Sequence, residues 1–588
     1  MKRVIFVVIA TVMTFLPCVA QTDDDMRAIV QAAGVNGIEE LDEYELERLA
    51  LLLENPVRIN VVGAGKLVYA GLLTRYQAAS LDDYRSRHGD VLSAAELAVV
   101  DGFTPSLVEA LRPFISFDSF RGVSLPSSGK MKYVAVMRSS LRVAGAGPDY
   151  AYSAKFRAGY GEYLSGNISL SRGYGASGAS PEIRSFGVSA NFPEVGLELL
   201  LGDFNARFGQ GLVMWNGMSM SGVVSPSSVR RNAPGLSSTW SFSGSSALTG
   251  AAAKWRCGHW EASAALALPG LKDAGLRDLG TVCLPMINLA WYGRCGQVAV
   301  THIAEMDGMR AGSLHIPDMK TSADMQICIR GINVYAETAY DWVNGIFATL
   351  AGSDWGAGES GRLGVHLRYY PAGYLSSWSA AVRSSSKCSN EYGISFSGES
   401  RKGLFSLDAA YYPVPKVKDN TSSLQMKAQI RWTPSVGERL KLGLRIVERW
   451  RSWGTAFRTE ARADVSLDIG RWTFASRANV LKCSGYGLLM YLEESWRNES
   501  LSVHVRHGAF RIDDWEDRIY VYERDAPGSF NVPAFYGRGV WASMYAGWRF
   551  WRHGRMYLRL FYVSYPFMTE ENEKPGKAEL RIQFAFSL

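Results

Sequence analysis

The sequence predicts a mainly β protein, in which a large transmembrane antiparallel β-barrel of roughly 20–24 strands follows a small all-α domain. Three observations lead to this prediction. The N-terminus has the pattern of an export signal. From about residue 130 onward, short stretches of alternating apolar and polar residues replace every helical pattern. The last twelve residues form one further alternating stretch.

The first element is an export signal over residues 1–20. Lys2 and Arg3 precede an apolar run that ends at Leu16, and small residues lead to a cleavage site after Ala20. A transmembrane helix needs about 20 apolar residues, and this run is shorter. We therefore expect a cleaved signal peptide, with a lipid anchor on Cys18 as the less favoured alternative.

Residues 21–56 form an acidic helical segment. Leucines recur at helical spacing among acidic residues, and the Asn55-Pro56 pair ends the helix because a residue before proline avoids the helical conformation. Over residues 21–118 there are 17 acidic and 8 basic side chains, a net charge of −9. The whole chain has a net charge of +7. Subtracting +2 for residues 1–20 and −9 for residues 21–118 leaves a net charge of about +14 for residues 119–588.

Residues 57–118 contain three further helix signals. A helix fits Arg75 to His88, with Thr74 as its N-cap and Gly89 just past its end. An S-x-x-E capping box begins at Ser93, and Thr104 caps the last helix with a proline at the first helical position. The region therefore predicts a compact helical domain, joined to the barrel by a linker over residues 119–129.

The barrel is predicted over residues 130–588. In the last segment, KAELRIQFAFSL, one strand face is wholly apolar and the other mostly polar, as expected of a strand that closes a barrel in lipid. A large soluble all-β protein, a propeller or a sandwich, is the alternative, but the sequence lacks the repeat of about 40–50 residues that propellers show. Tryptophans also recur near strand ends, as in the aromatic girdles of membrane barrels. Clear alternation runs through residues 424–432, 440–447, 461–469 and 501–506.

A barrel of this width leaves a lumen that wall side chains cannot fill. The irregular segment from Trp215 to Thr249 could occlude it, or could form an ordinary extracellular loop. Cations on the polar strand faces could line the lumen, where they would favour anionic solutes or hold an acidic plug. The alternative is that mixed charges line most large barrels and that exposed cations meet lipopolysaccharide phosphates. The expected lumen-facing cations are Lys427, Arg431, Lys441, Arg445, Arg458, Arg462 and Arg506.

The helical domain resembles a known module. The segments GLLTRYQAASLDDYRSRHG and LSAAELAVVDGFTPSLVEALRPFI resemble the tandem helix-hairpin-helix domain of bacterial competence DNA receptors. The whole chain looks like a family of outer-membrane proteins in which such a domain precedes a large barrel. The stretches GDF from Gly202, FGQGL from Phe208 and PAFYG from Pro533 are similar to that family's barrel motifs. The resemblance implies a periplasmic helix-hairpin-helix domain.

The resemblance also raises DNA binding, which the residues of the two hairpins disfavour. DNA-binding hairpins carry Gly-x-Gly, whereas these hairpins read Gly71-Leu72-Leu73 and Gly102-Phe103-Thr104 and lack the second glycine. The negative charge of the domain would repel a duplex, since phosphate neutralisation supplies most non-specific affinity. Residues that could still form a local DNA patch are Arg75, Arg85, Arg87 and Arg112.

The leading expectation is a non-enzymatic barrel of channel or transport type in the outer membrane, whose periplasmic module recruits a protein partner. The alternatives are a DNA-uptake component and a structural subunit of an envelope assembly. We expect contacts with membrane lipid and lipopolysaccharide, no cofactor and no metal, because neither a catalytic triad nor a ligand motif appears. Six cysteines follow the leader and are interpreted as small apolar residues: Cys257, Cys283, Cys295, Cys328, Cys388 and Cys483.

Overall fold

The structure is a computed structural model of the 588-residue chain. It describes residues 49, 52–53, 56–60 and 72–117, and then 131–588 with gaps at 146, 161–162, 193–194, 218–224, 227–229, 232, 243–246, 270–281, 294–295, 308–314, 331, 358–360, 401, 418–421, 435, 438, 455–456, 499, 530 and 568–575. The predicted signal peptide, most of the acidic helical segment and the linker lie outside the described residues.

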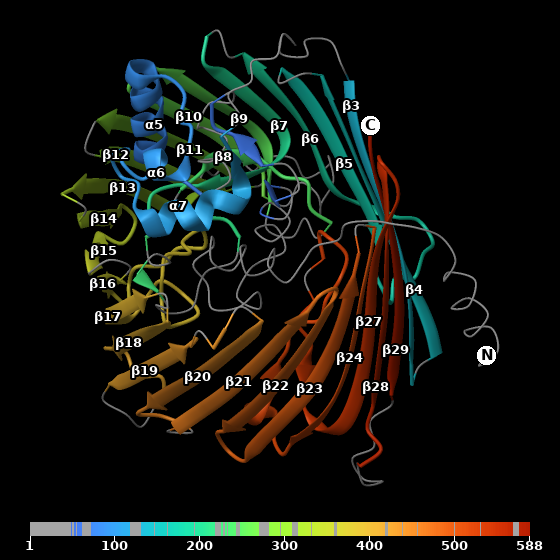
Figure 1. Cartoon of the computed structure of the whole chain (residues 1–588). Coiled ribbons are helices and arrows are strands. Elements are labelled where there is room, and N and C mark those ends of the chain that lie inside the picture. The colour runs from blue at the N-terminus through green and yellow to red at the C-terminus, as the bar shows by residue number, and fades with distance from the viewer. Residues whose placement is uncertain are drawn as a thin grey trace.

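Most of the described chain forms one closed antiparallel β-barrel, as predicted (Figure 1). Its 24 wall strands in the described chain agree with the expected number. They are β3 Met131–Ala144, β4 Gly147–Tyr160, β5 Leu164–Arg172, β6 Glu182–Phe192, β7 Leu197–Arg207, β9 Leu248–Cys257, β10 Trp260–Ala267, β11 Val282–Gly293, β12 Gly296–Asp307, β13 His315–Ile329, β14 Ile332–Asp341, β15 Ile346–Ala357, β16 Gly361–Tyr370, β17 Glu391–Ser400, β18 Gly403–Tyr412, β19 Ser423–Trp432, β20 Leu440–Arg451, β21 Phe457–Ile469, β22 Trp472–Lys482, β23 Tyr486–Arg497, β24 Leu501–Ile512, β27 Gly537–Trp551, β28 Gly554–Ser564 and β29 Lys577–Ser587.

The C-terminal strand closes the barrel, as its alternation predicts. β29 pairs with β28 on one side and with β3, the first wall strand, on the other. Along each strand, apolar side chains on one face are exposed while side chains on the other face are covered, as at Leu407, Ile430 and Met490 on the exposed face. An apolar outer surface of this kind is what a hydrocarbon environment requires, because closure pairs every wall strand with two neighbours.

The two rims of the barrel differ in the length of their connections. At the rim where β3 begins and β29 ends, no connection between wall strands exceeds seven residues. At the opposite rim, three connections are much longer, over residues 208–247, 371–390 and 513–536. The first of them contains a short strand, β8 Gly235–Ser238, that pairs with β7. The third contains the pair β25 Ile519–Tyr520 and β26 Ala534–Phe535.

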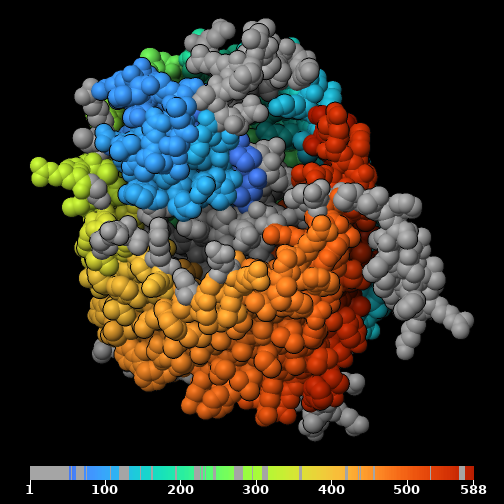
Figure 2. Space-filling model, viewed as in Figure 1, coloured from blue at the N-terminus to red at the C-terminus, as the bar shows by residue number. Residues whose placement is uncertain are grey.

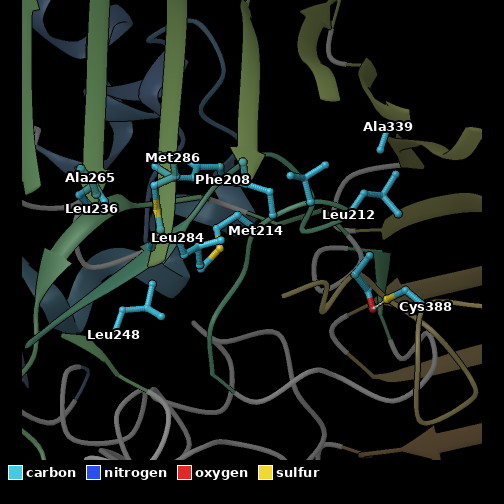
Figure 3. Close-up of a cluster of buried hydrophobic side chains, with 14 of the residues drawn as sticks. Phe208, Leu212, Met214, Leu236, Leu248, Ala265, Leu284, Met286, Ala339 and Cys388 are labelled. Atoms are coloured by element: carbon cyan, nitrogen blue, oxygen red, sulfur yellow. Dashed lines mark hydrogen bonds between the residues drawn. The ribbon is translucent and has the colours of Figure 1, made fainter. Parts of the chain in front are cut away.

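The lumen contains an apolar core. Side chains from the first long connection, including Phe208, Leu212 and Met214, pack against wall residues such as Leu284 and Met286 and are almost fully buried (Figure 3). Part of the lumen is therefore filled by buried apolar side chains. Most described residues of the predicted irregular segment, Trp215 to Thr249, are buried inside the barrel. Its last two residues are not part of the connection, because β9 begins at Leu248.

The N-terminal module contains α5 Arg75–His88, α6 Ala94–Leu97, α7 Pro105–Leu111, the 3-10 turn η2 Arg112–Phe114 and the parallel pair β1 Val57–Arg58 and β2 Ile115–Ser116. The predicted caps Thr74, Ser93 and Thr104 each accept a backbone N–H at the start of their helix. In Figures 1 and 2 these blue helices lie within the outline of the barrel rather than apart from it. None of the helices in the described part of the chain is long and apolar enough to cross a membrane.

Candidate functional site in the barrel lumen

A buried carboxylate fixes the first long connection to the wall. Glu337 of β14 points into the lumen, and its Oε2 accepts the backbone N–H groups of Gln210 at 2.7 Å and Leu212 at 3.1 Å. The turn needs glycine on either side of Gln210, because Gly209 and Gly211 have φ values of 56° and 90°. A Cβ at Gly209 would also lie 2.9 Å from the carboxyl carbon of Glu337. The FGQGL motif is therefore a glycine turn shaped around one wall carboxylate.

The second long connection packs on the first. Trp215 donates its backbone N–H to the carbonyl of Trp378 at 2.9 Å, and the Tyr374 hydroxyl donates to the carbonyl of Leu212 at 2.8 Å. Burial raises the pKa of Tyr374 well above its ordinary value, so the hydroxyl remains a donor. Together, residues 208–247 and 371–390 form one folded insert inside the barrel.

A buried arginine holds the second connection. Arg368 of β16 donates to Glu391 at 2.9 Å, to Asp408 at 2.8 Å and to the Ser395 hydroxyl at 2.7 Å. Glu391 in turn accepts the backbone N–H of Ser384, within the connection, at 2.9 Å. The three charged side chains are at most 3 % exposed, so loss of one of them would leave a buried charge without its partner.

The third long connection also folds inward. Glu523 accepts from Arg506 of β24 at 3.1 Å and from the indole N–H of Trp541 at 3.0 Å. Two residues on, Asp525 forms ion pairs with Arg559, at 3.7 Å, and with Arg581. Residues 513–536 are therefore bound to the wall formed by β24 and β27–β29.

The helical module contacts both the wall and the third connection. Arg362, at the short-connection end of β16, donates to the Thr104 hydroxyl at 3.1 Å. Helix α5 lies beside β11 and β12. Tyr522 and Val532 of the third connection pack into the hydrophobic core of the module. A residue of a predicted hairpin is thus in contact with the barrel.

The remaining hairpin residues mostly face the module's own core. Leu72, Leu73 and Phe103 are buried there, and the carbonyl of Gly102 accepts from the Gln77 side chain at 2.7 Å. Gly71 lies outside the described residues. The glycine at 102 is required, since its φ is 82° and a Cβ would lie 2.6 Å from the ring of Tyr76.

The arginines of the predicted DNA patch have acidic partners within the module. Arg87 pairs with Asp83 at 2.9 Å. Arg85 lies 3.4 Å from Asp82 and donates to a backbone carbonyl, and Arg112 lies 3.7 Å from a glutamate. The side chain of Arg75 lies outside the described residues.

All seven basic wall residues named from the sequence lie on the strand face opposite to the exposed apolar side chains. Six of them are in β19–β21 and are themselves partly exposed: Lys427, Arg431, Lys441, Arg445, Arg458 and Arg462. The seventh, Arg506, is buried under the third connection. The sequence pattern did not separate these two environments, and it missed Glu337 and Arg368 because a lone charge in an alternating strand looks like any other polar position.

The other two barrel motifs also have structural roles. Gly202 has a φ of 100°, and a Cβ there would lie 2.4 Å from a carbonyl oxygen of β6. The next residue, Asp203, accepts the backbone N–H of Phe186 at 2.9 Å. In PAFYG, Phe535 is buried at the strand pair β25 and β26.

The described cysteines form no disulfide; they are Cys257, Cys283, Cys328, Cys388 and Cys483, and Cys295 lies outside the described residues. No group of three or more metal-ligating side chains occurs in the part of the chain that the structure describes.

No protein-family model and no curated protein sequence matches the chain. Among solved structures, it is similar to the translocation pore of the P pilus usher PapC, with 8 % identity and a TM-score of 0.37 over 78 % of this chain and 99 % of that one. It is also similar to the outer membrane protein OpdK from Pseudomonas aeruginosa, with 12 % identity and a TM-score of 0.29 over 78 % and 99 % of the chains. The siderophore receptor PirA from Pseudomonas aeruginosa is similar as well, with 7 % identity and a TM-score of 0.38 over 78 % of this chain and 81 % of that one.

Proposed function

We propose that the protein is a non-enzymatic outer-membrane channel whose lumen is closed by its own insert and by the helical module. The observation that carries this proposal is the unequal covering of the lumen wall. Lys320 of β13 and Arg368 of β16 are at most 1 % exposed beneath the folded connections, whereas Arg445 and Lys441 of β20 are 19 % and 40 % exposed. A polar, partly exposed inner wall in a lipid-facing barrel is typical of a water-filled path.

The orientation follows from the connections. Membrane barrels have short periplasmic turns and longer extracellular loops. The rim with short connections, where β3 begins, is therefore the periplasmic rim in this proposal, and the Thr104–Arg362 contact lies beside it. The outer apolar surface is the contact for membrane lipid, and lipopolysaccharide surrounds the opposite rim.

The helical module is the part suited to release. The inserted connections are held by buried charged side chains such as Glu337, Arg368 and Glu523. The described contacts of the module with the barrel are instead the Thr104 hydrogen bond, the packing of Tyr522 and Val532 on its core, and the approach of α5 to β11 and β12. A protein partner that binds the module from the periplasm would free this part of the lumen, and the exposed Leu92 and Val99 offer apolar contacts for such a partner.

Conductance in planar bilayers tests the proposal. The full chain should give small or intermittent currents, and Tyr522→Ala should give larger or more frequent ones, because it removes an aromatic side chain that joins the module to the third connection. Trp515→Ala is the matched control, since it truncates an exposed aromatic of the same connection. Absence of current from all three proteins would refute a channel and favour a structural subunit of an envelope assembly.

DNA uptake by the module is the less well supported function. The hairpin residue Thr104 faces the barrel, and Arg85, Arg87 and Arg112 have carboxylates nearby. Titration of the full chain with short duplex and single-stranded DNA at low salt tests it. Binding that weakens as salt rises would place DNA uptake first, since it would show phosphate neutralisation.

A further inference from the structure

We propose that the inner wall formed by β19, β20 and β21 is an anion path, so that the solute of the channel carries phosphate or carboxylate groups. The inference rests on the proposed channel function and names its substrate class. The lumen-facing positions of these three strands hold eight cations and three anions. The cations are Lys427, Arg431, Lys441, Arg445, Arg449, Arg451, Arg458 and Arg462; the anions are Glu460, Asp464 and Asp468.

The register of the strands places like charges directly opposite one another. One row across the three strands is Lys427, Arg449 and Arg458, since Lys427 is the partner of Arg449 and Arg449 the partner of Arg458. Like charges at directly opposed positions destabilise a sheet. A wall that needed only polar side chains would not require this arrangement, so the row indicates a function that uses positive charge.

A second row repeats the arrangement nearer the short-connection rim. Arg431 is the partner of Arg445, and Arg445 is the partner of Arg462. Along β20, lumen-facing residues are two positions apart, about 7 Å. The cations of β20 thus extend from Lys441 at one end of the strand to Arg451 at the other.

The acidic residues of this wall neutralise only some of the cations. Glu460 pairs with Arg445 at 3.3 Å, and Asp464 pairs with Arg462 at 2.6 Å. On its other side Lys427 is opposite Asp408 of β18, but that carboxylate pairs with Arg368 at 2.8 Å. Within the described part of the chain, neither Lys427 nor Arg449 has a carboxylate at ion-pair distance, and Arg449 Nε is buried without a hydrogen-bond partner. These two opposed cations leave positive potential facing the lumen, where a diffusing anion could interact with both.

The contrast with the rest of the lumen supports a solute role. Elsewhere, cations of the wall hold the folded connections through carboxylates, as Arg368 does with Glu391 and as Arg506 does with Glu523. On β19–β21 the cations are partly exposed and arranged in rows, and among the described contacts only Arg458 reaches a folded connection, through the carbonyls of Glu516 and Arg518. Fixed charge of one sign along a narrow polar wall raises the local concentration of the opposite ion.

Ion selectivity of the full chain tests the inference. Currents are recorded in planar bilayers under a potassium chloride gradient, and the reversal potential gives the permeability ratio of chloride to potassium. We expect a ratio above one for the natural sequence and a severalfold lower ratio for the double variant Lys427→Gln/Arg449→Gln. The matched control, Arg471→Gln/Arg552→Gln, removes the same charge from exposed turns and should leave the ratio unchanged.

A second measurement does not depend on current. Inorganic pyrophosphate should raise the unfolding temperature of the full chain in detergent, and this rise should be lost in Lys427→Gln/Arg449→Gln but kept in the control. The double variant should fold normally, since it relieves a repulsion. A current with no anion preference, or a preference that survives in the double variant, overturns the anion path and leaves the channel standing. Absence of current from every protein, Tyr522→Ala included, overturns the channel and the anion path with it.

Discussion

Replacement of Arg368 by glutamine should destabilise the barrel interior strongly. The guanidinium group lies between Glu391 and Asp408 and is fully buried. Removing one member of a buried ion pair costs about 3–5 kcal/mol, because the remaining charge stays buried without compensation. Here two carboxylates lose their partner, but Glu391 keeps the backbone N–H of Ser384 and Asp408 keeps the Ser395 hydroxyl. We therefore expect the free energy of unfolding to fall by about 3 kcal/mol, near the lower end of this range.

The assay is urea unfolding of the purified protein in micelles, followed by tryptophan fluorescence, together with protease cleavage within residues 371–390. Arg87→Gln is the matched control, because its ion pair with Asp83 is about half exposed and should contribute about 0–1 kcal/mol. The double variant Arg368→Gln/Asp408→Asn should regain part of the loss, since it removes one buried charge along with its partner. A loss below about 1 kcal/mol for Arg368→Gln, with unchanged cleavage, would refute the view that this network holds the insert.

Three further predictions concern single side chains. Gly209→Ala should loosen the first connection and increase its cleavage by protease, because the added Cβ would meet the carboxyl of Glu337 at a position with positive φ. Equal cleavage of the variant and the natural sequence would contradict the role of the hydrogen bonds from the Gln210 and Leu212 amides to Glu337. Thr104→Ala should destabilise the module by about 1 kcal/mol, measured by hydrogen exchange, whereas Thr104→Ser should not, since serine keeps the capping hydroxyl. Tyr522→Ala should lower protection of the module by about 3 kcal/mol or more, as for a truncated core aromatic, and unchanged exchange would show that the module's core is complete without it.

The wall of the barrel could be predicted from the sequence because alternation is a local property. Residues 424–432 and 461–469 have an apolar residue at every second position, and a strand of that kind has one face for lipid whatever lies inside. The helix starts at Thr74 and Thr104 were predictable for the same reason, since a cap acts within three residues.

The contents of the lumen could not be predicted in this way. The contact between Glu337 and the turn at Gln210 joins positions 127 residues apart, and neither segment has a sequence pattern that indicates the other as its partner. The seven cations named from the sequence lie on the strand face opposite to the exposed apolar side chains, yet only the register shows that Lys427 opposes Arg449, and only the structure shows that Arg506 contacts a connection. Which cations are neutralised is a property of pairing between strands, which the pattern of one strand does not contain.

The presence of Tyr522 in the core of the N-terminal module has a consequence for biogenesis. The module precedes the barrel in the chain, whereas Tyr522 of its core lies about 400 residues further on, in the connection between β24 and β27. Contacts between such distant segments form late, because the intervening chain must first be ordered. The module should therefore remain incompletely folded until the barrel closes, so that a domain synthesised before the barrel becomes native only together with it.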